Sequence, residues 1–147
     1  MRLAPVLYVE DEEDDVLFMR RAFTTIGIAN RLDIARNGEE AIVYLKAAEA
    51  SGDLPHLILL DLNLPILSGF DVLDWTRKSA SFRETAICVL SSSDHPRDVE
   101  RAKEQGADDF RVKPSSPVQL TAFVQQINQR WLSGLALSNR FFRHQSG

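Results

Sequence analysis

Five residues able to take part in phosphoryl or metal chemistry stand directly after apolar runs of the sequence. Glu10 and Asp11 follow the run APVLYV, and Asp61 follows HLILL. Ser91 follows AICVL, and Lys113 follows a weaker run. The set combines carboxylates, a hydroxyl and an ammonium group. A carboxylate beside a metal ion, a lysine and a hydroxyl is equipped to be the nucleophile of a phosphoryl transfer that forms an aspartyl-phosphate.

Asp61 is the member of this set that is hardest to explain as a surface charge. It comes directly after apolar residues, and an isolated charge leaving a buried strand is costly without a partner. A helix dipole accounts for the acids at 12–15, but Glu10 and Asp11 precede that helix. Carboxylates gathered in one place repel one another. Mg²⁺ is the natural ion to offset this repulsion, because it prefers carboxylate, water and phosphate oxygens. We therefore expect a Mg²⁺ site to which Lys113 adds positive charge.

Alternating strands and helices are needed to bring these residues together. Apolar runs predict strands at 4–9, 56–60 and 86–90, with weaker candidates at 31–35 and 109–112. The expected helices lie before Gly27, after Gly38, after Gly69, between Pro96 and Gly106, and after Pro117. This alternation predicts a three-layer, doubly wound α/β fold. In such a fold the carboxyl ends of the strands carry the reactive groups.

The composition excludes several classes of protein. A chain of 147 residues with 44% hydrophobic and 26% charged residues is typical of one globular domain. A net charge of −4 provides no basic field for nucleic acid or an anionic membrane. Cys88 is alone, which excludes a disulfide framework, and we expect it in the core. With no membrane-length apolar run or signal-peptide core, we expect a cytoplasmic protein with no nucleic-acid or membrane partner.

The sequence resembles the receiver domains of two-component response regulators. The resemblance is carried by VEDE at 9–12, LLDLNLPILSG at 59–69, VLSSS at 89–93 and VKP at 112–114. It covers about residues 4–131 and implies a receiver domain at 1–131. The fold it implies is a flavodoxin-like (βα)5 architecture with a five-stranded parallel sheet in the order 2-1-3-4-5.

The same resemblance assigns a role to each residue of the site. It implies that Asp61 is the phosphoacceptor, that Ser91 and Lys113 bind the phosphoryl group, and that Phe110 is the switch aromatic. Ser91 is also the switch hydroxyl. The implied protein ligands of Mg²⁺ are Glu10, Asp11, Asp61 and the backbone carbonyl of Asn63.

Three residues depart from the commonest pattern of the family. Glu10 stands where Asp is more frequent, and its extra methylene favours contact with Mg²⁺ through water. Ser91 replaces Thr and lacks the methyl group that stiffens χ1. Phe110 replaces Tyr, so no switch here can use a tyrosine hydroxyl. In many relatives the bond corresponding to Lys113–Pro114 is cis.

A narrower resemblance concerns the partners. LILLDLNLP, VLSSSD and QRWL look like the single-domain regulators paired with bacterial and cyanobacterial phytochrome kinases. This implies a sensor histidine kinase, phytochrome-type, as the partner of a signalling protein that is not an enzyme. Autophosphorylation from small donors and slow autodephosphorylation are expected with it. The extension at 132–147 is rich in Leu and Phe, so we expect a homodimer through this segment and the preceding helix.

Two enzyme or cofactor-binding functions do not fit these residues, and one non-enzymatic alternative does. Phosphatases of the haloacid-dehalogenase type carry a second acid two residues after the nucleophile, where this chain has Asn63. A nucleotide or flavin site needs a glycine-rich loop after the first strand, where this chain has acids. A receiver-like module that dimerises without phosphorylation stays open. No acid follows Asp109 while several bases do, which is either chance or a sign that this end meets an acidic surface, such as a second copy.

Overall fold

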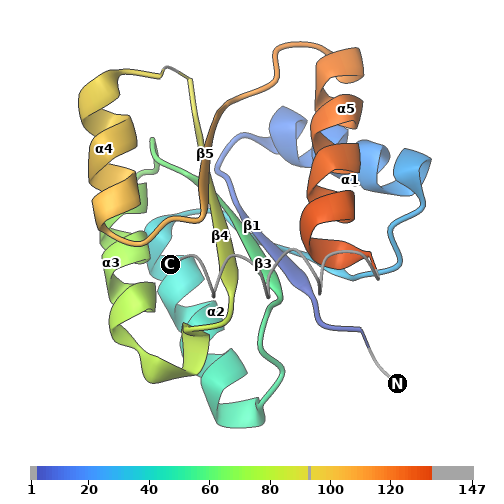
Figure 1. The fold of residues 1–147 in the computed structure, drawn as a ribbon. Coiled ribbons are helices and arrows are strands. Elements are labelled where there is room, and N and C mark those ends of the chain that lie inside the picture. The colour runs from blue at the N-terminus through green and yellow to red at the C-terminus, as the bar shows by residue number, and fades with distance from the viewer. Residues whose placement is uncertain (1–2, 93, 134–147) are drawn as a thin grey trace.

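A parallel sheet lies between two layers of helices (Figure 1). The computed structural model describes residues 3–92 and 94–133. Within these residues the five strands are β1 (Val6–Val9), β2 (Leu32–Ala35), β3 (Leu57–Asp61), β4 (Ala86–Ser91) and β5 (Asp109–Val112). The main helices are α1 (Glu13–Ile26), α2 (Gly38–Ser51), α3 (Gly69–Lys78), α4 (Pro96–Glu104) and α5 (Pro117–Ile127). All strand pairs are parallel, and the order β2-β1-β3-β4-β5 confirms the predicted fold class.

Each face of the sheet contributes side chains to its own hydrophobic cluster. Leu57 and Leu59 of β3 pack in a cluster with residues of α1 and α5, whereas Ile58 and Leu60 pack with residues of α2, α3 and α4. This division follows from the alternation of side chains along a strand. Because helices cover both faces, the central strands are buried throughout, which explains their unbroken apolar runs. Cys88 lies buried in the first cluster, as predicted.

Most helices begin or end at the Gly, Asn and Pro residues that favour helix ends. Gly27 ends α1 in the left-handed conformation at φ 82°, and the side chain of Asn37 caps α2. Pro96 and Pro117 are the first residues of α4 and α5, where a missing N–H does no harm. A π-helical turn, Asn128–Leu132, continues α5 and buries Trp131.

Gly69 allows α3 to begin very close to the end of β3. A Cβ atom at this position would clash with the carbonyl oxygen of Asp61 and lie 2.7 Å from the Cα of Leu62. The Gly69 N–H in turn donates to the Leu62 carbonyl at 3.1 Å. Because Gly69 has no side chain, the start of α3 can pack directly against the backbone of Asp61 and Leu62.

Ile66, in the loop between β3 and α3, has a strained backbone. Its φ is 72°, and its side chain is 71% exposed. β-Branched residues are disfavoured in the left-handed region, whereas Asn tolerates it. We expect Ile66→Asn to raise the free energy of unfolding by about 1 kcal/mol, as measured by urea denaturation. Val43→Asn, at an exposed helical position, is the control, and an equal gain there would mean that backbone strain is not the cause.

One peptide bond and the C-terminal extension differ in how far the structure describes them. The Lys113–Pro114 bond is trans, unlike that of many relatives, since the described residues hold no cis peptide bond. Of the extension at 132–147, residues 134–147 lie outside the described residues, so the boundary at 131 and a dimerisation arm stay predictions. None of the helices that the structure describes has the length and apolar character needed to cross a membrane.

Candidate functional site

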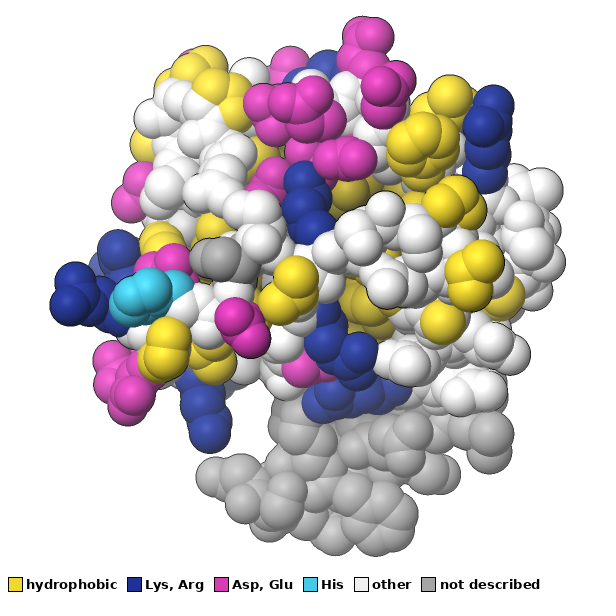
Figure 2. Space-filling view, turned by 90° about the horizontal axis from the view of Figure 1, so that it is seen from above, with side chains coloured by type: hydrophobic (Ala, Val, Ile, Leu, Met, Phe, Trp, Pro, Cys, Tyr) yellow, Lys and Arg dark blue, Asp and Glu magenta, His cyan; other side chains and the backbone are white. Residues whose placement is uncertain are grey.

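Acidic side chains gather at the edge of the sheet formed by the carboxyl ends of the strands. Seen from above, these side chains form a patch that borders a basic side chain (Figure 2). Asp61 and Ser91 are the last residues of β3 and β4, whereas the sequence analysis placed them just after the strands. Glu10 and Lys113 follow the last residues of β1 and β5. The predicted convergence of these residues is therefore observed.

Lys113 is the cation at the centre of the cluster. Its Nζ lies 2.6 Å from Glu10 Oε1, 3.1 Å from Asp15 Oδ2 and 3.2 Å from Asp61 Oδ2. Burial alone would lower the pKa of Lys113, but the hydrogen bond with Glu10 and the charge of Asp61 raise it above its ordinary value. The ammonium group therefore keeps its charge at any physiological pH. Its backbone N–H donates to the Ser91 carbonyl at 2.7 Å, which ties the end of β5 to β4.

The Glu10 carboxylate is fully buried and hydrogen-bonded on both oxygens. Oε1 accepts from the Tyr8 hydroxyl at 3.0 Å and meets Lys113 Nζ, while Oε2 accepts the backbone N–H groups of Asp11 at 3.1 Å and Glu12 at 3.3 Å. Both oxygens of this buried carboxylate therefore have hydrogen-bond or ion-pair partners within the protein. Burial, together with the charge of Asp61, raises the pKa of Glu10 to about 7 against the opposing effect of Lys113.

Asp61 presents a nearly buried carboxylate with two fixed contacts. The residue is 2% exposed. Its Oδ1 accepts the Asn63 N–H at 3.0 Å, and its Oδ2 accepts from Lys113. The following residue stays in the ladder, since the Leu62 N–H donates to the Leu90 carbonyl at 3.1 Å. The carboxylate is therefore held in a single orientation at the end of a central strand.

Three of the carboxylates can share one metal ion. Glu10, Asp11 and Asp61 each offer an oxygen, and these oxygens lie within 4.8 Å of one another. Asp11 is exposed and Asp61 is buried, so the group reaches from solvent into the edge of the sheet. Asn63 is exposed in the adjoining loop, with its side-chain amide donating to Ser92 Oγ at 3.3 Å. An all-oxygen donor set of this kind suits Mg²⁺.

Ser91 and Phe110 occupy the opposite face of the sheet from the cluster of α1 and α5. Phe110 packs partly against the cluster of α2, α3 and α4, and it pairs with Val89, two residues before Ser91. By strand alternation Ser91 therefore faces the same side. Ser91 is buried, and Phe110 lines a cavity of about 270 Å³ beside Val99 and Lys103 of α4. The two predicted switch residues thus lie between the acidic cluster and α4.

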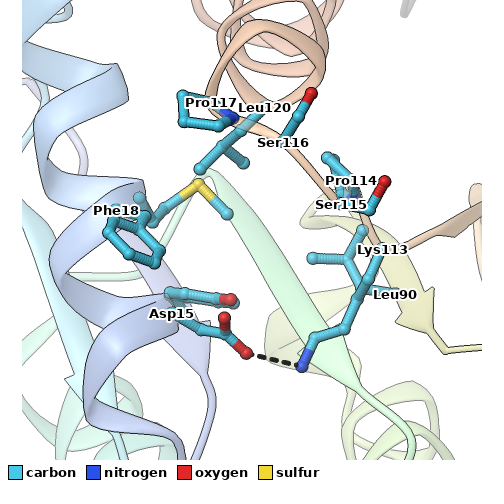
Figure 3. Close-up of a pocket in the computed structure, with 11 residues that line it drawn as sticks. Asp15, Phe18, Leu90, Lys113, Pro114, Ser115, Ser116, Pro117 and Leu120 are labelled. Carbon is cyan, nitrogen blue, oxygen red and sulfur yellow. Dashed lines mark hydrogen bonds and ion pairs between the residues drawn. The ribbon is translucent and has the colours of Figure 1, made fainter.

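Tyr8 and Asp15 are members of the site that the sequence analysis missed. Tyr8 stands two residues before Glu10, which puts both on one face of β1, and a buried hydroxyl at that spacing needs an acceptor. Asp15 was expected only to favour the start of α1, but its carboxylate pairs with Lys113. Both residues also line an apolar pocket of about 270 Å³ between α1 and the loop before α5 (Figure 3).

Comparison with known proteins decides the family. A model of the response regulator receiver domain matches residues 6–125. The chain belongs to the response regulator receiver family. Receiver domains are phosphorylated by kinases and bind Mg²⁺ or Mn²⁺ in an acidic pocket, and this receiver domain has the corresponding cluster of Glu10, Asp11 and Asp61.

The relatives of this receiver domain include phytochrome response regulators. Response regulator Rcp1 of Synechocystis sp. is 30% identical over 90% of this chain and 91% of its own. The probable methanogenesis regulatory protein FilR2 of Methanothrix harundinacea is 34% identical over 86% of this chain and 83% of its own. Phosphorylated cyanobacterial phytochrome response regulator RcpA superposes with a TM-score of 0.82 at 28% identity, over 89% of this chain and 95% of RcpA. Mn²⁺-bound Rcp1 superposes with a TM-score of 0.79, over 89% of this chain and 96% of Rcp1.

Proposed function

We propose that this receiver domain accepts a phosphoryl group on Asp61 from a sensor histidine kinase. The observation that carries the proposal is the buried Asp61 carboxylate, which is held by Lys113 and the Asn63 N–H beside two further acids. A buried cluster of like charges with a single lysine is costly to maintain for stability alone. It has a purpose if a metal ion and a phosphoryl group join it.

The proposed reaction uses each of these residues in a definite way. An oxygen of Asp61 attacks the phosphorus of a phosphohistidine, a P–O bond forms, the P–N bond breaks, and the leaving imidazole takes up a proton. Lys113 and Ser91 bind the phosphoryl oxygens. Asp11, Asp61 and the Asn63 carbonyl would hold Mg²⁺, and the buried Glu10 carboxylate would contact it through water. Bound Mg²⁺ would neutralise charge on the transferring group.

The output is a change in protein contacts, because phosphorylation adds about 1.5–2 negative charges at a site that borders both faces of the sheet. We propose that Ser91 and Phe110 transmit this change to the surface around α4 and α5. The likeness to Rcp1 and to the phytochrome response regulator RcpA supports a kinase of the phytochrome type as the donor, and we propose that the transfer takes place in the cytoplasm. The apolar pocket next to Lys113, with half-exposed Phe18 at its wall, offers a place for the donor protein to dock.

Intact-protein mass spectrometry tests the central proposal. The full chain is incubated with acetyl phosphate and Mg²⁺, and we expect the mass to rise by one phosphoryl group. Asp61→Asn should abolish this increase, because an amide cannot form the acyl phosphate. Asp74→Asn, an exposed carboxylate on α3, is the control and should leave the increase intact. Equal labelling of the wild type and Asp61→Asn would place the modification elsewhere.

Dimerisation through α5 and the extension remains part of the proposal. Val118 of α5 is 80% exposed, and the polar side chains of this helix are uncharged, which suits a protein interface better than free solvent. We expect the full chain to be a dimer and a chain ending at Trp131 to be a monomer, as measured by light scattering. A full chain that forms a dimer but takes up no phosphoryl group from acetyl phosphate and Mg²⁺ would instead favour the phosphorylation-independent module.

A further inference from the structure

The hydroxyl of Tyr8 belongs to the same buried network as the acids of the site. Tyr8 is 2% exposed, and its hydroxyl donates to Glu10 Oε1 at 3.0 Å. Among the described residues, Glu10 is the hydrogen-bond acceptor for this hydroxyl. The same Glu10 oxygen lies 2.6 Å from Lys113 Nζ, and Lys113 continues the network to Asp61 at 3.2 Å. The hydroxyl is thus linked to the Asp61 carboxylate through two residues.

The length of Glu10 and the presence of Tyr8 depend on each other. A glutamate at the end of β1 reaches Lys113 and still lies beside the residue two positions earlier on the same face of the strand. An aspartate is one methylene shorter, so a carboxylate at this position could not keep both contacts. Tyr8 would then bury a hydroxyl without an acceptor, which destabilises a protein. The tyrosine is therefore matched to glutamate at this position.

We propose that Tyr8 is a positioning residue of the site, whose hydroxyl holds the Glu10 carboxylate against Lys113 and thereby fixes the ammonium group beside Asp61. Two backbone N–H groups anchor the other oxygen of Glu10, so Tyr8 and Lys113 decide how the first oxygen is oriented. The inference rests on the proposed function, since the placement of Lys113 matters most if that residue binds a phosphoryl group.

A double-mutant cycle tests the pairing in metal-free protein. We expect Tyr8→Phe to raise the unfolding equilibrium constant about tenfold in the wild type, because a buried charge loses a hydrogen bond. In Glu10→Asp the same change should lower that constant, because it removes an unpaired hydroxyl. Tyr44→Phe is the matched control: its hydroxyl donates to Asp33 at 2.5 Å, and its effect should be the same with or without Glu10→Asp. Equal effects of Tyr8→Phe in both backgrounds would overturn the proposal.

The position of Lys113 is tested by nitrogen-15 NMR of its ammonium protons at low temperature. Ion pairing slows the exchange of these protons with water, so we expect exchange in Tyr8→Phe to be about threefold faster or more, with no change in Tyr44→Phe. An unchanged Lys113 signal in Tyr8→Phe overturns the proposal even if the stabilities are coupled, because Tyr8 would then support only the fold. Neither measurement uses metal or phosphodonor, so both hold if Asp61 proves not to be phosphorylated.

Discussion

Replacing Lys113 with methionine is expected to lower the free energy of unfolding by about 3 kcal/mol at pH 8 in the absence of Mg²⁺. The substitution leaves Glu10, which is fully buried, and Asp61, which is 2% exposed, without their cation. Removing one partner of a buried ion pair destabilises strongly, because the other partner remains desolvated. Urea denaturation of the two proteins measures the difference.

The pH dependence and a surface lysine serve as controls for the Lys113 variant. At pH 5, below the raised pKa of Glu10, this carboxyl takes up a proton in either protein, so the loss should be smaller than at pH 8. Lys78→Met, in an exposed pair with Asp74 on α3, should change stability by well under about 1 kcal/mol. Equal losses at both pH values would mean that the charge of Glu10 does not explain the effect.

The metal-free protein is also expected to become less stable as the pH rises, through Glu10. The pKa of Glu10 in the folded state is about 7, above the ordinary value of 4.5, so the folded state binds more protons between these values. The contribution of Glu10 is fully present below pH 4.5 and is lost as the pH rises through 7. The total change is about 3 kcal/mol.

Glu10→Gln isolates this contribution, because glutamine does not titrate. The unfolding free energy of the wild type minus that of Glu10→Gln should fall by about 3 kcal/mol as the pH rises from 4 to 8. Saturating Mg²⁺ should reduce the change, since a nearby cation favours the ionised carboxyl. A difference that does not vary with pH would contradict the prediction, because it would show that the pKa of Glu10 is the same in the folded and unfolded states.

The fold was predictable because its signals are local and repeated. Buried strands covered on both faces have continuous apolar runs in the sequence, and Gly27, Gly38 and Pro117 stand at helix ends as expected. The ends of strands were less predictable. Asp61 and Ser91 belong to the strands, because they still pair with residues of the adjacent strands. The sequence does not indicate this, because a charged or polar residue interrupts the apolar run that predicts the strand.

The composition of the site was predictable where strand ends dictated it, and not where side-chain length did. Glu10, Asp61 and Lys113 meet because parallel strands end at one edge. Tyr8 lies before that edge, and only the reach of Glu10 back along the strand brings the two into contact. Asp15 lies on α1, and its contact with Lys113 depends on the angle at which that helix leaves the sheet.

The separation of the hydrophobic interior into two halves has a consequence for communication within the molecule. Lys113 and Glu10 stand at the border of the half that contains α1 and α5, whereas Ser91 and Phe110 stand at the border of the half that contains α4. The sheet otherwise keeps these halves from touching. A phosphoryl group on Asp61 would be bound by residues at both borders and would connect the two halves. Packing in the half that contains α4 could then respond to a change in the half that contains α1 and α5.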